Sequence, residues 1–182
     1  MKWNRAVLLG LLAAAALLVV GGCTSQSTRA VLTVVSLNDG KTYYSDLINT
    51  ADSLHPYIPV DNIPITLGNI QNDGGAPLDP GTPFSEIVVT GYSVTYNPPI
   101  YTPVSGGLSM RVSSGGTTDG AIAISNLADK AALPLNTAAT TTATIKFTGY
   151  NRVNGSANGD AVEATGYITV QVANFGDNNV NQ

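Results

Sequence analysis

The chain has few charged residues, one histidine and one cysteine. Of its 182 residues, eight are Lys or Arg and twelve are Asp or Glu, so charged residues make up 11% of the sequence. Proteins that bind nucleic acid cluster basic side chains against the phosphates, which an acidic chain poor in Lys and Arg does not offer. A glycine-rich phosphate loop with a lysine is also lacking. We therefore expect neither nucleic acid nor a nucleotide as a partner.

The sequence offers little for catalysis. His55, the only histidine, precedes Pro56 in a stretch without periodicity, and the sequence contains no Gly-x-Ser-x-Gly motif. Glu86 and Glu163 are the only glutamates, and nothing in the sequence brings them to one cleft, as a glycosidase would require. We expect His55 to be an exposed or locally bonded loop residue, and we predict that the protein is not an enzyme.

Metal ligands are scarce as well. Asn72–Gly75 with Asp79, and the stretch 154–160, are oxygen-rich loops of the kind that calcium uses, but neither follows the order of an EF-hand. Asn, Asp and Gly are also the residues that turns require. We interpret both segments as turns and predict no metal and no cofactor apart from a covalent lipid.

The N-terminus is the most informative segment. Lys2 and Arg5 precede an almost wholly apolar run, residues 6–20, which ends in small residues before the only cysteine, Cys23. A positive start, an apolar centre and small residues at the cleavage site are typical of a secretory signal. Val20-Gly21-Gly22-Cys23 resembles the lipobox of bacterial lipoproteins, in which small residues precede a cysteine.

The resemblance implies that residues 1–22 are a signal peptide and that Cys23 becomes the mature N-terminus, carrying a diacylglycerol and an N-acyl chain. Two or three buried acyl chains hold a protein on a bilayer where one does not. Thr24, rather than Asp, follows the cysteine, which implies the outer membrane if the host is Gram-negative. A retained transmembrane anchor and a cleaved signal with an incidental cysteine are the alternatives, but the apolar run is shorter than the roughly 20 residues of a span.

Removing residues 1–22 leaves 160 residues (182 minus 22), with six basic and twelve acidic side chains. Residues 23–29 form a lipidated tether about 20 Å long at full extension. Residues 30–175 are long enough for one domain with a real core. Residues 176–182 are polar and are expected to be a disordered tail. No cysteine remains for a disulfide, so the core must hold the domain together.

Residues 30–175 read as an all-β domain. Apolar and polar residues alternate, or β-branched residues gather, in about seven segments separated by turn signals: 30–37, 63–70, 85–96, 108–112, 121–125, 143–150 and 162–172. Gly91 suggests a bulge. A short helix over 45–54 and a helical turn over 127–135 are the only helical expectations. This pattern predicts an antiparallel, immunoglobulin-like β-sandwich, with a jelly roll or incomplete barrel as alternative.

The last two predicted strands carry a second resemblance. Ala143–Tyr150 and Val162–Val170 are similar to uncharacterised immunoglobulin-like bacterial envelope proteins, although the cysteine pair of true immunoglobulins is absent. Thr-Gly-Tyr occurs at 90–92, 148–150 and 165–167. We interpret it as strand chemistry rather than as a ligand-facing ladder, since Thr and Tyr favour sheets.

Tyrosines near loops are the remaining candidates for binding: Tyr43, Tyr44, Tyr57, Tyr96 and Tyr101. Tyrosine-bearing loops on a rigid sandwich suit contacts with sugars or proteins. The alternative is that these rings close the ends of the sandwich. The sequence thus predicts a lipid-anchored cell-envelope protein with a non-catalytic structural or binding role toward a protein or a polysaccharide. The alternative function is an accessory subunit that assembles or stabilises an exported envelope complex.

Overall fold

The computed structural model describes residues 30–71, 86–152 and 159–176. The predicted signal peptide, the tether with Cys23 and all but the first residue of the predicted tail lie outside the described residues. So do the oxygen-rich stretch that begins at Asn72 and most of the second one. None of the helices in the described part is long and apolar enough to cross a membrane.

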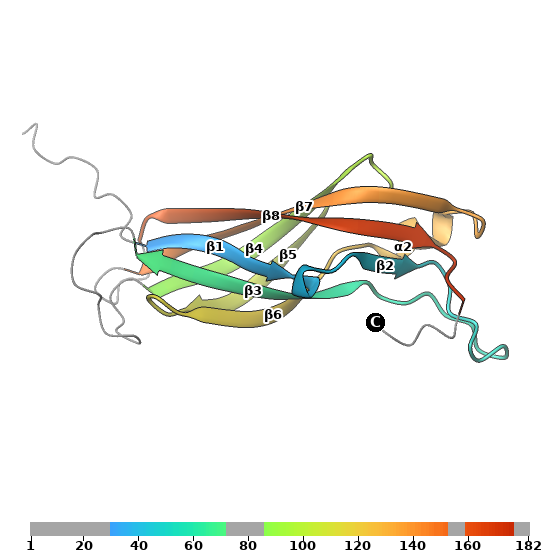
Figure 1. The fold of residues 1–182 in the computed structure, drawn as a ribbon, viewed down its shortest axis with the longest axis horizontal. Coiled ribbons are helices and arrows are strands. Elements are labelled where there is room, and N and C mark those ends of the chain that lie inside the picture. Colours follow the sequence, from blue (N-terminus) through green and yellow to red (C-terminus); the bar gives the residue numbers. More distant parts are fainter. Residues whose placement is uncertain (1–29, 72–85, 153–158, 177–182) are drawn as a thin grey trace, which may run out of the picture.

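The described residues form an immunoglobulin-like sandwich of two β-sheets (Figure 1). One sheet has the order β1-β3-β6, with β1 (Ala30–Leu37), β3 (Asn62–Gln71) and β6 (Thr117–Ala123). The other has the order β2-β8-β7-β4-β5, with β2 (Tyr43–Asp46), β8 (Ala161–Ala173), β7 (Ala138–Arg152), β4 (Glu86–Asn97) and β5 (Val104–Val112). The predicted all-β sandwich is confirmed.

After its first strand, the chain passes from one sheet to the other. β1 pairs with β3, the chain then turns through the 3-10 segment η1 (Asn38–Gly40), and β2 joins the edge of the second sheet. All three residues of η1 have positive φ, a backbone conformation that Asn, Asp and Gly tolerate best. β2 runs parallel to β8, so this sandwich is antiparallel except at that edge.

β2 corrects one prediction. The expected helix over 45–54 is absent, because residues 43–46 pair with β8 and Asn49 bridges Tyr57 in the loop that follows. The segment is short and lacks alternation, so its pairing depends on β8, far away in the sequence. β6 also begins at Thr117, inside the stretch expected to be a turn. The predicted helical turn is confirmed as α2 (Leu127–Ala132), capped by the Asn126 side chain.

A bulge in β4 changes which residues face the core. The register with both neighbouring strands shifts between Val89 and Gly91, as the glycine suggested. The extra residue switches the parity of the strand, so Ile87 and Val89 point inward together with Val94. Strict alternation along the strand would place Ile87 and Val89 on the face opposite to Val94, because it ignores the bulge.

The core lies between the sheets and consists mainly of Ile, Val and Leu. It is centred on fully buried side chains from both sheets, among them Ile63, Ile65, Leu67, Ile87, Val89, Ile145, Phe147 and Val170. Along β8 buried and exposed residues alternate over almost the whole strand. The predicted inward residues of the last two strands, such as Ile145, Phe147 and Ile168, are buried as expected.

The three Thr-Gly-Tyr segments lie on β4, β7 and β8, three neighbouring strands of one sheet. Gly91 sits at the bulge, and Gly149 lies opposite it with no room for a side chain, since an added Cβ would meet the backbone of Val88. Gly166 lies under Val34 of β1 and allows the two sheets to approach at their edge. The glycines of the repeat therefore allow close packing of strands and sheets.

Candidate functional site

The candidate tyrosines separate into a buried group and an exposed group. Tyr43 on β2, Tyr96 on β4 and Tyr101 in the loop between β4 and β5 are buried. The rings of Tyr96 and Tyr101 meet edge to face, with their centroids 5.4 Å apart. These three tyrosines therefore lie inside the sandwich, as the alternative interpretation expected, and not on a surface that a partner contacts.

The buried tyrosines surround a carboxylate that the sequence analysis did not single out. Asp61, which immediately precedes β3, is fully buried and accepts hydrogen bonds at both oxygens. Ser45 and Ser125 each donate to Oδ2 at 2.6 Å. The Tyr43 hydroxyl donates to Oδ1 at 3.4 Å. These donors compensate for the water that the carboxylate loses on burial.

Lys130 on α2 supplies the countercharge. Its Nζ lies 2.7 Å from Asp61 Oδ1, and the side chains of both residues are 0% exposed. The same Nζ donates to the backbone oxygen of Pro59 at 2.8 Å. An ion pair out of water is stable only when hydrogen bonds satisfy both ions, and here both ions have such partners. We call Asp61, Lys130, Ser45, Ser125 and Tyr43 the buried network.

The direction of the remaining hydrogen bond follows from the chemistry of the groups. Ser45 has one hydroxyl hydrogen, and the ionised Asp61 has none to give, so Ser45 donates to Asp61. The Tyr101 hydroxyl, 2.7 Å from Ser45 Oγ, is therefore the donor to Ser45. The Tyr96 hydroxyl donates elsewhere, to the backbone oxygen of Ile124.

Burial disfavours the charged form of these phenols. It raises the pKa of Tyr101 to about 12, and the negative charge of Asp61 acts in the same direction. Burial and the same carboxylate also raise the pKa values of Tyr43 and Tyr96 above their ordinary value of 10.0. All three phenols are therefore neutral hydrogen-bond donors at physiological pH.

The buried network connects four parts of the chain that are distant in sequence. Ser45 belongs to β2, Asp61 to the end of the β2–β3 loop, Ser125 to the β6–α2 connection and Lys130 to α2. Asp129 extends the connection to the β4–β5 loop, because its carboxylate accepts from both the backbone N–H and the hydroxyl of Thr102. The network thus fixes the bases of the loops at one end of the sandwich.

The same end carries exposed apolar side chains. Ala30, where β1 begins, lies at the opposite end of the elongated molecule from α2 and the β2–β3 loop (Figure 1). The large exposed apolar residues of the β2–β3 loop, of α2 and of the connection that follows α2 are Leu54, Tyr57, Val60, Leu127 and Leu135, and Leu54 is 83% exposed. We call this group of five residues the tip.

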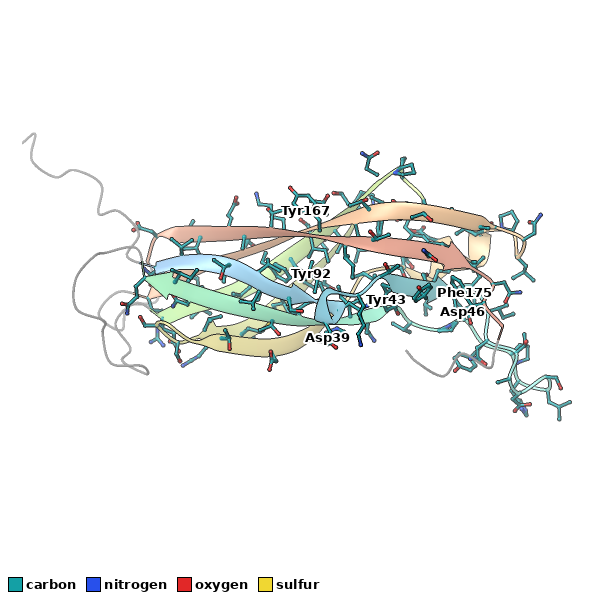
Figure 2. All side chains as sticks on the ribbon, in the orientation of Figure 1. Asp39, Tyr43, Asp46, Tyr92, Tyr167 and Phe175 are labelled. Carbon is teal, nitrogen blue, oxygen red and sulfur yellow. The ribbon has the colours of Figure 1, made fainter. Side chains whose placement is uncertain are left out.

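Tyr44 and Tyr57 are the two candidate tyrosines that reach solvent. Tyr57 belongs to the tip, where its backbone pairs with that of Asn49. Tyr44, on β2, packs edge to face on Phe175 with ring centroids 5.5 Å apart. Figure 2 places Phe175 beside Asp46, in the half of the molecule that carries α2, and the Phe175 N–H donates to Asp46 at 3.0 Å.

His55 is a locally bonded loop residue, as expected. Its Nδ1 lies 2.8 Å from Asp52 Oδ2, and both side chains are largely exposed. The hydrogen bond from His55 lowers the pKa of Asp52. No group of three or more His, Cys, Asp or Glu residues in the described ranges is arranged to hold a metal ion.

Comparison of the chain with protein-family models gave no match, and comparison with curated proteins gave none.

Sequence reasoning missed Asp61 and Lys130 because neither follows a recognisable motif. Asp61 stands one residue before a predicted strand, and Lys130 lies in a predicted helical turn, where a lysine ordinarily faces solvent. The one available signal was the scarcity of charged residues in the chain. A chain with so few of them has little reason to place one directly before an apolar strand, as it does at Asp61. Their pairing depends on a fold that brings together residues 69 positions apart.

Proposed function

We propose that the protein is lipid-anchored in the bacterial cell envelope through Cys23, in the outer membrane if the host is Gram-negative. We propose further that it has a non-catalytic role and binds an envelope partner, a protein or a polysaccharide. Two observations support the anchor, namely the lipobox-like segment and the start of β1 at one end of the molecule (Figure 1). An anchor at that end leaves the tip directed away from the bilayer.

The observation that carries the binding role is that five exposed apolar side chains lie in segments at the tip end of the molecule. Leu54, Tyr57 and Val60 lie on a loop whose base is fixed by the buried network, so a partner meets side chains on a rigid support. Apolar residues grouped on a surface are typical of protein contacts. A rigid base lowers the ordering cost of binding. These features favour a protein as the partner at the tip.

Site-specific photocrosslinking in intact cells tests this role. Leu54 is replaced by benzoyl-phenylalanine, and Val35 is replaced in the same way as a matched control, since Val35 is also an exposed aliphatic residue but lies on β1. We expect one discrete adduct from position 54 and none from position 35. Digestion with protease identifies a protein partner, and loss of the adduct after periodate oxidation identifies a polysaccharide. Absence of an adduct at 54, or the same adducts at both positions, would contradict the proposal.

The second candidate is an accessory subunit of an exported envelope complex. The same apolar tip favours it, because a permanently covered surface tolerates exposed Leu and Val better than a surface that is free part of the time. The two roles differ in stoichiometry. A subunit co-purifies with its complex in a fixed ratio after gentle detergent extraction, whereas a binding protein is recovered partly free.

A further inference from the structure

The outer face of the larger sheet differs in chemistry from the tip. β8, β7 and β4 are neighbours in this sheet, and residues paired across antiparallel strands project from the same face. Pairing places Thr95, Thr144 and Tyr167 in one row across the three strands. The rows on either side consist of Asn97, Thr142 and Thr169, and of Ser93, Lys146 and Thr165. We call these nine residues the hydroxyl face.

Among the described residues, the hydroxyl groups of this face form no side-chain hydrogen bond. Thr66, Thr118 and Thr141, which lie elsewhere, each donate a side-chain hydrogen bond to another residue. In the described part of the chain, the side chains of the face other than Lys146 make no such bond. Their positions follow the strand spacing of about 4.8 Å in one direction and the two-residue repeat of about 6.8 Å in the other. The result is a regular array of donors and acceptors.

Tyr167 lies in the central row and is 69% exposed. Figure 2 places it near the middle of β8, away from both ends of the strand. Its ring packs on no other aromatic ring among the described residues. An exposed ring beside hydroxyl groups offers an apolar surface for the C–H face of a sugar, while its neighbours offer hydrogen bonds to the sugar hydroxyls.

The charge of the face limits what it can bind. Lys146, its only charged member, pairs with Glu163 at 2.8 Å, so the face carries no net charge. A nucleic acid or an acidic polymer requires unpaired basic groups. A protein contact requires apolar side chains, and the face offers none except the threonine methyls and one ring. An uncharged partner rich in hydroxyl groups is complementary to it.

We propose that the hydroxyl face of β8, β7 and β4 binds a neutral polysaccharide, with Tyr167 stacking on a sugar ring and Thr95 and Thr144 hydrogen-bonding to sugar hydroxyls. This inference rests on the proposed binding role, but it names a different surface from the tip. The two can therefore fail independently, since crosslinking at position 54 tests only the tip.

Retention of the full-length protein, purified in detergent, on immobilised polysaccharides tests the inference. The neutral probes are dextran, mannan, galactan, xylan and a β-1,3-glucan, and the acidic probes are alginate and polygalacturonate. We expect at least one neutral polymer to retain the protein more strongly than either acidic polymer. Tyr167→Ala should weaken that retention about tenfold, as truncation of a central aromatic contact commonly does. Val35→Ala, at an exposed position on β1 of the other sheet, should leave it unchanged.

A second variant separates loss of binding from loss of folding. Thr144→Val keeps the shape and the strand preference of the side chain and removes only its hydroxyl. We expect it to weaken retention several-fold while the circular dichroism spectrum and the midpoint of urea unfolding stay those of the parent. Retention by no neutral polymer, or full retention of Tyr167→Ala and Thr144→Val, would overturn the inference.

Discussion

Asp61 and Lys130 form an ion pair in which both side chains are fully buried. The structure predicts that Lys130→Met lowers the free energy of unfolding by about 3–5 kcal/mol, because the Asp61 carboxylate then stays buried without its countercharge. Urea denaturation followed by circular dichroism measures this loss.

Lys146→Met is the matched control for that substitution. The pair between Lys146 and Glu163 has side chains 45% and 58% exposed, so water already screens it. Its loss should cost less than about 1 kcal/mol. Equal losses for the two variants would show that Asp61 and Lys130 are not shielded from water as the structure has them.

The buried tyrosines predict how stability depends on pH. A phenol with a raised pKa in the folded state keeps its proton at a pH where the unfolded chain has lost its own. The contribution of Tyr101 to stability is therefore complete below its ordinary value of 10.0 and is lost as the pH rises through about 12. The raised pKa values of Tyr43 and Tyr96 act in the same sense. We expect the free energy of unfolding to fall steadily above about pH 10.

Absorbance at 295 nm, recorded on the folded protein and on the urea-unfolded chain, tests this pH dependence. At pH 11 the folded protein should show fewer ionised phenols than the unfolded chain, which exposes all eight tyrosines, because Tyr43, Tyr96 and Tyr101 keep their protons in the fold. Equal ionisation of the folded and unfolded chains at that pH, with the fold intact, would contradict burial of Tyr43, Tyr96 and Tyr101.

For single residues, the sequence predicted whether a side chain is buried or exposed better than it predicted which residues that side chain contacts. Alternation correctly assigned Ile145 and Phe147 to the core, and the position of His55 before a proline correctly indicated a loop. The sequence pattern did not show which of the tyrosines face solvent. Tyr43 and Tyr44 are adjacent, and only the pairing of β2 with β8 turns the first inward and the second outward.

At the level of the strands, β4 and β7 lie close together beside the bulge, at Gly149. An added Cβ on Gly149 would clash with the Val88 carbonyl oxygen, which is backbone and cannot rotate away. We therefore expect Gly149→Ala to force the strands apart and to cost about 1–3 kcal/mol of unfolding free energy. Chemical denaturation compares this variant with the parent.

Gly107→Ala provides the control for the glycine effect. Gly107 lies on β5 in the same sheet, and an added Cβ there meets nothing within 4 Å. Replacing a glycine with alanine reduces the conformational entropy of the unfolded chain, so this variant should be as stable as the parent or slightly more stable. A Gly149→Ala variant as stable as Gly107→Ala would mean that the strands are not in contact at the bulge.

Strands with a local signature could be predicted, whereas those that depend on distant partners could not. β1, β3, β7 and β8 show alternation or β-branched residues; β1 was predicted with its observed bounds, and the ends of the other three were predicted to within five residues. β2 has only four residues and shows no alternation in the sequence, so nothing local marks it as a strand. The bulge residue Gly91 was recognised, but its effect on the parity of β4 follows only from the register with β5 and β7.

For the whole molecule, the proposed anchor, the tip and the hydroxyl face lie on different surfaces. β1 begins at one end, the tip lies at the other, and the hydroxyl face covers the flank formed by β8, β7 and β4 (Figure 1). The fold class followed from the sequence because turn signals and alternation recur along the entire domain. The tip and the hydroxyl face did not, because each is assembled from segments far apart in the chain.

Flotation of the protein with lipid vesicles, after its recovery from native membranes, tests the proposed anchor most directly. We expect the parent protein to float with the vesicles, to begin at Cys23 and to exceed the mass of its polypeptide by that of the acyl chains. Cys23→Ser should remain at the bottom of the gradient, because no thiol is left to carry the diacylglycerol. An unmodified thiol in the parent, or a serine variant that still floats, would contradict the lipid anchor and the orientation of the tip derived from it.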